Sequence, residues 1–462
     1  SAQRRRGPPT ASVIEEPPMS RITELRCRAC ATSAPVGPSY VCVRCFGPLE
    51  VVYDDDLIRA TISREQIGAR PAGIWRYHEL LPVDVPPERG LPVGSTPLQR
   101  AVRLGERLGI ERLWLKNDSL NPTLSFKDRV VAVAAARAQE FGFDTLACAS
   151  TGNLAGAVAA AAGVLGLPSY VFVPADIEPA KICQALAFGA RLVPVDGTYD
   201  EINRLSIEVA DELGWAFVNV NLRPYYAEGS KTLAYEVAEQ LGWRLPDVVV
   251  VPIASGSLYT KVAKGFDELV RFGLVEAHPV RFIGAQPEGC APVADAFRDG
   301  LEHPVPIEKP RTLVKSLAIG SPADGASALA LARRSGGSIE AVSDGATRAA
   351  MRLTAENEGI FTETAGGCTI AALAQARANG LIRADDEVVA LLTGNGLKTP
   401  EAMDSSGSAA RDGDEPLLET GLVPAARRIK PTFAEVEGWL ASDRRRKPVP
   451  WADPLQSPLS VG

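Results

Sequence analysis

The sequence predicts an α/β fold with two layers of mainly parallel strands. Between residues 94 and 403, short apolar runs alternate with amphipathic helical stretches. Continuous apolar runs of this kind are typical of parallel strands that are buried on both faces. Roughly 310 residues with this alternation contain too many strand and helix candidates for one small sheet, so we expect two α/β layers. A cysteine-bearing segment at residues 21–53 precedes them and predicts a small zinc-ribbon-like unit.

The individual elements follow from this alternation. The strand candidates are the apolar runs at residues 113–116, 145–149, 170–173, 191–195, 216–220, 248–251, 282–285 and 388–392. The helix candidates lie at residues 128–140, 154–165, 180–188, 201–213, 231–241 and 259–272. Strands that alternate with helices in this way are expected to pair in parallel.

Shifts in composition mark the expected domain boundaries. We expect, in order, a flexible tail at residues 1–20, the zinc-ribbon-like segment at 21–53, a connector at 54–93, a core of two α/β subdomains at 94–403, and a linker with a C-terminal appendage at 404–462. The smaller subdomain of the core is expected at roughly 125–225, and the appendage is predicted to contain a short helix at 433–440.

The charge balance argues against a nucleic acid or a membrane as partner. Lys and Arg total 49 against 56 for Asp and Glu, so the formal net charge is −7, and any anion site must be local. No run of about 18 apolar residues is present, which argues against a spanning helix. The first 20 residues are rich in Arg and Pro, unlike a secretory signal, and eight cysteines are too few for a disulfide scaffold. We therefore expect a cytoplasmic protein.

Four of the cysteines form two pairs with metal-ligand spacing. Cys27 and Cys30, and then Cys42 and Cys45, are CxxC pairs separated by eleven residues. Each pair can place two thiolates on one tight turn, and two such turns supply four tetrahedral ligands for zinc. A metal-free relic and a redox CxxC are the alternatives. Because four protein ligands leave no open coordination position, the expected role of the zinc is structural.

The sharpest chemical signal is Lys127, in the stretch Asn-Pro-Thr-Leu-Ser-Phe-Lys-Asp-Arg at residues 121–129. This lysine stands where a loop enters a predicted helix, with Ser125 as the expected helix cap. A partly desolvated amine near the positive end of a helix suits nucleophilic, Schiff-base chemistry. The alternative is a solvated lysine of the first helical turn that pairs with Asp128.

Three further loops have the composition of ligand-binding turns. Residues 150–153 (Ser-Thr-Gly-Asn) lie between a predicted strand and an Ala-rich helix, where N–H groups of the helix can hold a carboxylate or phosphate. Residues 254–258 (Ala-Ser-Gly-Ser-Leu) predict a second anion cradle after another strand. Thr393 stands at the end of a strand, where α/β folds place ligands. Together with Lys127, these loops predict a phosphorylated cofactor that is linked to a lysine.

These motifs, in this order, resemble those of the threonine synthases, a family of fold-type-II pyridoxal-phosphate enzymes. The resemblance covers residues 21–399. It is carried by the stretches at residues 94–98, 121–129, 150–153, 223–232, 363–367 and 392–398. The stretches at 228–232 and 393–398 are more characteristic of threonine synthases than the other stretches are. A Cys-rich N-terminal ribbon occurs in one branch of that family. The resemblance implies two parallel-sheet α/β domains of the tryptophan synthase beta type.

The resemblance also implies roles for individual residues. By it, Lys127 binds pyridoxal phosphate as a Schiff base and transfers protons. Asn153 is expected to contact the phenolic oxygen of the cofactor, and Thr393 its pyridine nitrogen. The expected ligands of the cofactor phosphate are Ala254, Ser255, Gly256, Ser257 and Leu258.

The substrate side follows from the same resemblance. The expected ligands of the substrate carboxylate are Ser150, Thr151 and Gly152. One branch of the family has an arginine two residues before the Glu-Gly pair, where this chain has Tyr226. Asn221 and Arg223 lie nearby in the sequence and are the expected substitutes. An Arg223 that faces solvent is the alternative.

The reaction that the resemblance implies is the conversion of O-phospho-L-homoserine and water to L-threonine and phosphate. The expected partner is a phosphorylated amino acid, and the expected assembly is a homodimer. A threonine or serine dehydratase, or a paralogue that performs β- or γ-replacement, would keep the cofactor motifs and change the substrate loop. A binding module with an inactive core and a purely structural protein are the alternatives from other classes.

Two roles stay open for Glu363: support of the active site, or capping of the helix that follows.

Overall fold

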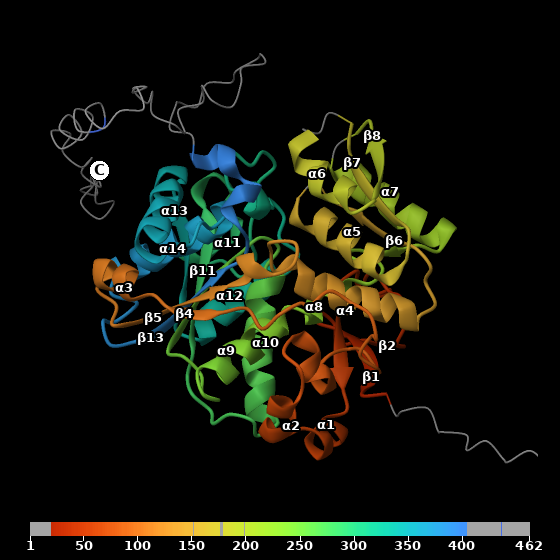
Figure 1. The fold of residues 1–462 in the computed structure, drawn as a ribbon, viewed down its shortest axis with the longest axis horizontal. Coiled ribbons are helices and arrows are strands. Elements are labelled where there is room, and N and C mark those ends of the chain that lie inside the picture. The colour runs from red at the N-terminus through yellow and green to blue at the C-terminus, as the bar shows by residue number, and fades with distance from the viewer. Residues whose placement is uncertain (1–19, 151, 176–178, 198, 404–435, 437–462) are drawn as a thin grey trace, which may run out of the picture.

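The computed structural model describes residues 20–150, 152–175, 179–197 and 199–403, together with Val436. Three sheets organise this part of the chain (Figure 1). The expected N-terminal tail apart from Ser20, and the predicted helix at 433–440 apart from Val436, lie outside the described residues. Within the described residues, every helix is too short or too polar to reach across a bilayer.

The N-terminal unit is a small antiparallel sheet in the order β2-β1-β3. Its strands are β1 (Ile22–Cys27), β2 (Ser33–Ala34) and β3 (Leu49–Tyr53). Alternate residues of β3 are buried, because successive side chains of a strand point to opposite faces. Two short helices follow, α1 (Asp55–Thr61) and α2 (Arg64–Ala69), and these lie at the bottom of the view in Figure 1.

The larger α/β unit contains a six-stranded sheet in the order β12-β11-β10-β13-β5-β4. Its strands are β4 (Leu98–Arg100), β5 (Arg112–Asn117), β10 (Val248–Pro252), β11 (Arg281–Pro287), β12 (Ser338–Val342) and β13 (Glu387–Leu392). Neighbouring strands are parallel, except that β4 pairs antiparallel with β5. The carboxyl ends of β10 and β13 therefore meet at one edge of the sheet.

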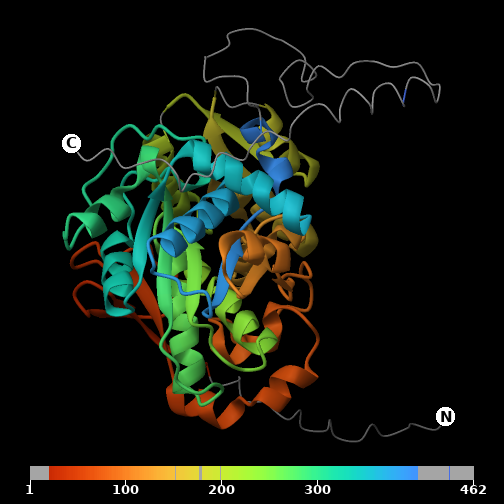
Figure 2. The same cartoon turned by 90° about the vertical axis from the view of Figure 1, so that its left-hand side faces the viewer.

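Both faces of this sheet are covered, which explains its unbroken apolar runs. In β10, Val248 and Val250 belong to one apolar cluster, whereas Val249 and Val251 belong to another. The helices of the first cluster are α3 (Val102–Leu108), α13 (Asp344–Glu358) and α14 (Thr364–Ala378). The second, larger cluster includes residues of α9 (Lys231–Gln240), α10 (Ser257–Arg271), α11 (Pro292–Arg298) and α12 (Gly325–Arg334), and it extends beyond this sheet. Figure 2 shows α13 and α14, in cyan and blue, in front of the strands.

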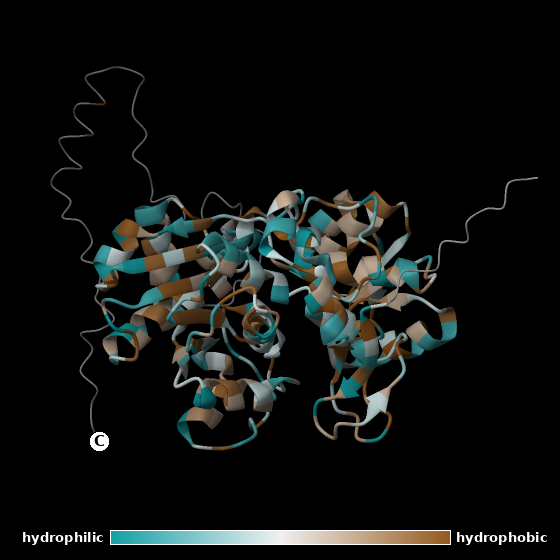
Figure 3. Ribbon diagram, turned by 90° about the horizontal axis from the view of Figure 1, so that it is seen from below, coloured by the Kyte–Doolittle hydropathy of each residue, from teal (hydrophilic) through white to brown (hydrophobic). Residues whose placement is uncertain are grey.

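The smaller α/β unit contains four parallel strands in the order β8-β7-β6-β9. They are β6 (Leu146–Ala149), β7 (Ser169–Pro174), β8 (Arg191–Val195) and β9 (Ala216–Phe217). The helices around this sheet are α4 (Lys127–Glu140), α5 (Asn153–Leu165), α6 (Pro179–Ala187), α7 (Tyr199–Leu213) and α8 (Arg223–Glu228). Figure 3 shows apolar residues, in brown, on strands and on helices, next to hydrophilic residues, in teal. Two α/β layers and a small N-terminal sheet confirm the predicted fold class.

The predicted strands are confirmed, with one of them shortened. The apolar run at 216–220 is a strand only over Ala216–Phe217. The chain then turns, and the N–H of Val220 donates to the carbonyl of Phe217 at 2.9 Å. This turn directs the chain into α8, which lies against α4. An apolar run that looks like one strand therefore supplies a strand and the turn toward the site.

Candidate active site

The backbone of Lys127, the first residue of α4, is tied to the end of β13. Ser125 and Gly394 form an antiparallel bridge, and the Phe126 N–H donates to the Thr393 carbonyl at 2.9 Å. The predicted helix cap is wrong, because the N-cap residue is Phe126, which makes no side-chain cap hydrogen bond. The Ser125 backbone pairs with Gly394 in the bridge, and the buried Ser125 hydroxyl has no hydrogen-bond partner among the described residues. The lysine thus stands where the two α/β units meet.

Tyr226 on α8 is the partner of the lysine amine. Lys127 Nζ donates to the Tyr226 hydroxyl at 2.9 Å and lies 4.7 Å from the centre of the Phe126 ring. The alternative pairing with Asp128 does not occur within the described residues. The Asp128 carboxylate instead accepts from the N–H and the hydroxyl of Thr123, each at 2.7 Å. Sequence reasoning missed the role of Tyr226, since it marked the position only as a departure from one branch of a family.

Glu363 connects two predicted cofactor ligands. Its carboxylate accepts from Asn153 Nδ2 at 2.9 Å and from the Thr393 hydroxyl at 3.2 Å. The residue is 3% exposed, and burial raises the pKa of its carboxyl, while both hydrogen bonds and the charges of Lys398 and Lys127 oppose that rise. Glu363 is the N-cap residue of α14, but its side chain makes no cap hydrogen bond. Of the two roles left open by the sequence, the geometry favours support of the site.

The loop at 254–258, between β10 and α10, has the form of an anion cradle. Gly256 has a φ of +93°, and a Cβ there would lie 2.9 Å from the carbonyl oxygen of Asp324, so the position favours glycine. Within the described chain, the backbone N–H groups of Ser255, Gly256 and Leu258 have no backbone acceptor. Unpaired N–H groups at the start of a 15-residue helix attract anions. This loop fits a phosphate group.

The first of the predicted substrate-binding segments lies between β6 and α5. The Ser150 hydroxyl accepts from the Gly152 N–H at 3.3 Å, and Gly152 is exposed. Thr151 lies outside the described residues. Because Asn153 begins α5 directly after Gly152, this end of the segment lies beside the hydrogen bond between Asn153 and Glu363.

The second predicted substrate-binding segment precedes and begins α8. Arg223 is half-buried, and its guanidinium lies 3.4 Å from the carboxylate of Asp324. Asn221 is engaged differently, because its amide donates to the Trp215 carbonyl at 3.0 Å. The Asn221 Oδ1 atom is buried without a partner among the described residues. The contacts give Arg223 an anionic neighbour, and substrate binding by either residue stays a prediction.

Lys398 is a second cation close to Glu363. Its Nζ donates to Gln184 Oε1 on α6 at 2.6 Å. Burial lowers the pKa of this amine, while the carboxylates of Glu363 and Asp128 oppose the shift. Because α6 belongs to the smaller unit and Lys398 follows β13, this hydrogen bond crosses between the two α/β units. The sequence placed Lys398 in a family motif without a role.

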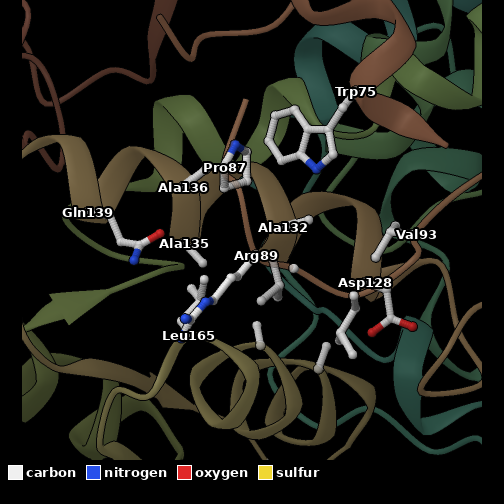
Figure 4. Close-up of a pocket in the computed structure, with 15 residues that line it drawn as sticks. Trp75, Pro87, Arg89, Val93, Asp128, Ala132, Ala135, Ala136, Gln139 and Leu165 are labelled. Carbon is white, nitrogen blue, oxygen red and sulfur yellow. The ribbon is translucent and has the colours of Figure 1, made fainter. Parts of the chain in front are cut away.

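A pocket with about 390 Å³ of space, partly open to solvent, lies away from these groups (Figure 4). It is lined by α4, α5 and the connector, with Trp75, Arg89 and several alanines. None of the predicted site residues lines it, although Asp128, next to the site lysine, does. The amine, Glu363 and the anion loop therefore form a site distinct from this pocket.

The four N-terminal cysteines meet at one point. The sulfur atoms of Cys27, Cys30, Cys42 and Cys45 all lie within 4.8 Å of one another. The Sγ–Sγ distances are 3.4 Å for Cys27–Cys45, 3.3 Å for Cys30–Cys45 and 3.7 Å for Cys30–Cys42. Four thiolates about 2.3 Å from a tetrahedral zinc ion would be about 3.8 Å apart. The donor set and its spacing therefore fit a structural metal ion.

Comparison with known proteins agrees with this geometry. The model of a family described as pyridoxal-phosphate dependent enzyme matches residues 90–394. The chain is 36% identical to a threonine synthase of Methanocaldococcus jannaschii over 394 residues, which cover 85% of this chain and 95% of that protein. It is also 36% identical to a threonine synthase of Methanosarcina acetivorans, with coverage of 79% and 89%.

Solved structures agree on the fold. The processed form of threonine deaminase isoform 2 from Solanum lycopersicum aligns with a TM-score of 0.58 at 20% identity, over 85% of this chain and 99% of that chain. A fungal L-serine ammonia-lyase from Rhizomucor miehei aligns with a TM-score of 0.57 at 22% identity, over 67% and 96%. The chain belongs to the family of pyridoxal-phosphate dependent enzymes, and within that family it is a homologue of the threonine synthases.

Proposed function

We propose that this chain is a threonine synthase, which converts O-phospho-L-homoserine and water to L-threonine and phosphate. The observation that carries the proposal is the match to threonine synthases along nearly their whole length, 95% of one of them. The aligned stretch of 394 residues is longer than the predicted core at 94–403. The enzyme class that follows is a pyridoxal-phosphate-dependent lyase acting on a phosphorylated amino acid.

Lys127 is the residue that would hold the cofactor and move protons. Its Nζ is half-buried at the start of α4, within reach of the Tyr226 hydroxyl. Bound pyridoxal phosphate would supply a conjugated ring that accepts the electron pair left when a proton leaves the substrate carbon. The amine of Lys127 would remove protons from the substrate and return them, and Tyr226 would hold that amine in place.

Asn153 and Thr393 would orient the cofactor ring, and Glu363 would fix both of them. The Asn153 amide and the Thr393 hydroxyl bond to the same buried carboxylate, so neither side chain rotates independently. We assign the phosphate of the cofactor to the loop at 254–258, whose N–H groups lack backbone acceptors among the described residues. Preorganised donors of this kind stabilise a fixed charge without reorganisation during the reaction.

The substrate would bind between the segment at 150–152 and the start of α8. The segment at 150–152 would hold the carboxylate of the amino acid, and Arg223 would attract its phosphate group. Loss of a proton from Cα and another from Cβ would let phosphate leave Cγ. Return of a proton to Cγ, addition of the hydroxyl of water at Cβ and return of a proton to Cα would then complete L-threonine. The hydrogen bond between Lys398 and Gln184 joins the two α/β units. It is therefore suited to hold them together while water is excluded.

We assign the four N-terminal cysteines to a structural zinc ion. Four thiolates within 4.8 Å of one another offer a closed tetrahedral set with no position for a substrate. The buried side chains of the small sheet, such as Leu25, Val51 and Tyr53, belong to the main apolar cluster of the molecule, so the segment has no separate core of its own. Small units without their own core commonly need a metal for stability.

Product analysis tests the proposal. The full chain, loaded with pyridoxal phosphate, should release phosphate and form threonine in equal amounts from O-phospho-L-homoserine. A Lys127→Ala variant should retain the circular dichroism spectrum of the native fold and lose turnover by at least about 1,000-fold. Ammonia release from threonine or serine, without phosphate release from phosphohomoserine, would identify a dehydratase instead. Absence of both reactions would reject the proposed activity and leave the family membership intact.

A further inference from the structure

Arg28 reaches from the four-cysteine segment into the core of the molecule. It stands between Cys27 and Cys30, and its backbone N–H donates to the Pro48 carbonyl at 3.0 Å. Its guanidinium lies 2.7 Å from the carboxylate of Asp324, which is 296 residues away in the sequence. The two side chains are 20% and 6% exposed, so solvent screens this pair less than a surface ion pair. The pair links a candidate metal-binding turn to the residue that precedes α12.

Asp324 contacts the anion loop directly. Its backbone N–H donates to the Ser255 carbonyl at 2.8 Å, and its carbonyl oxygen lies 2.9 Å from where a Cβ of Gly256 would be. Asp324 is the N-cap residue of α12, but its side chain makes no cap hydrogen bond. Its carboxylate pairs with arginines instead. A negative charge is therefore held beside a loop suited to bind an anion, and that charge opposes binding unless a cation balances it.

The same carboxylate contacts Arg223 at 3.4 Å, and the rest of α8 is also held by the N-terminal segment. The Tyr225 hydroxyl donates to the carbonyl of Gly37 at 2.9 Å and accepts from its N–H at 3.0 Å. The Tyr53 hydroxyl donates to Glu228 at 2.8 Å. The helix that carries the partner of the site lysine is therefore fastened along its length to the four-cysteine segment.

We propose that Arg28 is a positioning residue of the active site, which acts through Asp324 on the anion loop and on Arg223. Arg28 neutralises Asp324 beside the loop and leaves Arg223 available to the substrate side. The four-cysteine segment thereby sets the affinity of the site for phosphate, in addition to its structural role. This inference rests on the proposed assignment of residues 254–258 to the cofactor phosphate.

A comparison of two cofactor forms isolates the effect. Pyridoxal phosphate and pyridoxal share the ring and the aldehyde, and only the first has a phosphate. Their dissociation constants are measured by absorbance titration of the full chain after the cofactor has been stripped. We expect the wild type to prefer pyridoxal phosphate strongly. In Arg28→Ala that preference should fall about tenfold, which is about 1.4 kcal/mol, with pyridoxal affinity unchanged.

Two further variants separate positioning from damage to the metal segment. Arg44→Ala removes an exposed arginine from the second cysteine pair, where it makes no ion pair with any described residue, and should leave the preference unchanged. Asp324→Asn removes the charge that Arg28 balances, so adding Arg28→Ala to Asp324→Asn should cost little further preference. The double variant separates charge balance from metal loss. If Arg28→Ala acted by releasing metal, it would lower the preference equally in the wild type and in Asp324→Asn.

Three results would overturn the inference. They are an unchanged preference in Arg28→Ala, an equal loss of affinity for both cofactor forms, and a loss in the double variant as large as in the single one. If the wild type itself does not prefer pyridoxal phosphate to pyridoxal, the proposed phosphate loop fails as well. These outcomes do not depend on whether threonine is the product, so they are distinct from failure of the proposed reaction.

Discussion

Glu363 and Asn153 are separated by 210 residues in the sequence, yet the Asn153 amide donates to Glu363 Oε2 at 2.9 Å. Asn153 begins α5 over the smaller sheet, and Glu363 precedes α14 on the larger one. The bond therefore ties one predicted cofactor ligand to the opposite α/β unit. Thr393, bonded to the other oxygen of the same carboxylate, completes a link between three segments.

Replacement of this carboxylate should impair turnover more than substrate binding. In Glu363→Gln, one of the two donors, the half-buried Asn153 or the buried Thr393, loses its acceptor, which costs about 1–3 kcal/mol. We expect kcat to fall by about ten- to a hundredfold with little change in KM, since 1.4 kcal/mol is a factor of ten. Glu340→Gln is the matched control, because Glu340 is also buried and accepts from Ser338 and Gln375. Equal kcat values for both variants would contradict the role of Glu363.

Removal of the hydroxyl that faces the lysine amine should also lower kcat. Tyr226→Phe keeps the ring and deletes the acceptor 2.9 Å from Lys127 Nζ. A hydrogen bond to a charged group contributes about 1.5–3 kcal/mol, so a decrease of about ten- to a hundredfold is expected. Steady-state kinetics on the product assay measures it, with Tyr40→Phe, an exposed tyrosine, as control. A Tyr226→Phe enzyme with wild-type kcat would show that the amine does not need this partner.

Asp128 predicts a specific dependence of stability on pH. Burial raises the pKa of its carboxyl from 3.8 to about 6, against the opposing hydrogen bonds from Thr123. The folded state therefore binds this proton more tightly than the unfolded state, so the stabilising effect is complete below pH 3.8 and is lost as pH rises through about 6. The shift corresponds to about 3 kcal/mol.

Asp128→Asn should remove this dependence, since an amide stays neutral. Relative to the wild type, the variant should gain melting temperature between pH 4.5 and pH 7.5, because only the wild type acquires a buried charge over that interval. Differential scanning calorimetry at both pH values measures the difference. The same difference in Tm at both values would be inconsistent with a raised pKa at Asp128.

Metal removal should destabilise the N-terminal unit. We expect about one zinc ion per chain, and we expect a strong chelator to lower the Tm by roughly 5–10 °C. Cys42→Ser should have the same effect without chelator, since it deletes one of four clustered thiolates. Cys183→Ser changes an exposed cysteine outside the cluster and should leave metal content and Tm unchanged. Full zinc occupancy in Cys42→Ser would argue against a four-thiolate site.

The elements that sequence reasoning missed have a physical explanation. α14 (Thr364–Ala378) is buried almost all around, so its residues show no contrast between an apolar face and a polar face. The strand β12 (Ser338–Val342) contains Ser, Glu and Ala among its five residues. Its Glu340 side chain accepts hydrogen bonds from Ser338 on the same strand and from Gln375 on α14. Only the pairing of β12 with β11, and the packing of α14 against the strands, make these two segments recognisable as parts of the larger α/β unit.

Local patterns in the sequence determined the fold class and the composition of the site. Apolar runs at 248–251 and 388–392 indicate strands, because a strand that is buried on both faces needs apolar side chains at consecutive positions. Loops with glycine after such strands, and a lysine that opens a helix, likewise indicate ligand-binding turns from neighbouring residues alone. These features can be recognised without knowing which elements pack against them.

Tertiary structure alone decided which groups act on one another. Tyr226 meets Lys127 across 99 residues, and Arg28 meets Asp324 across 296. Hydrogen bonds and ion pairs between residues so far apart in the sequence depend on how helices and sheets pack, because separate elements set the positions of the two side chains. No local periodicity encodes that relation. The carboxylate that joins the two predicted cofactor ligands and the arginine that connects the cysteines to the anion loop therefore became visible only in the folded chain.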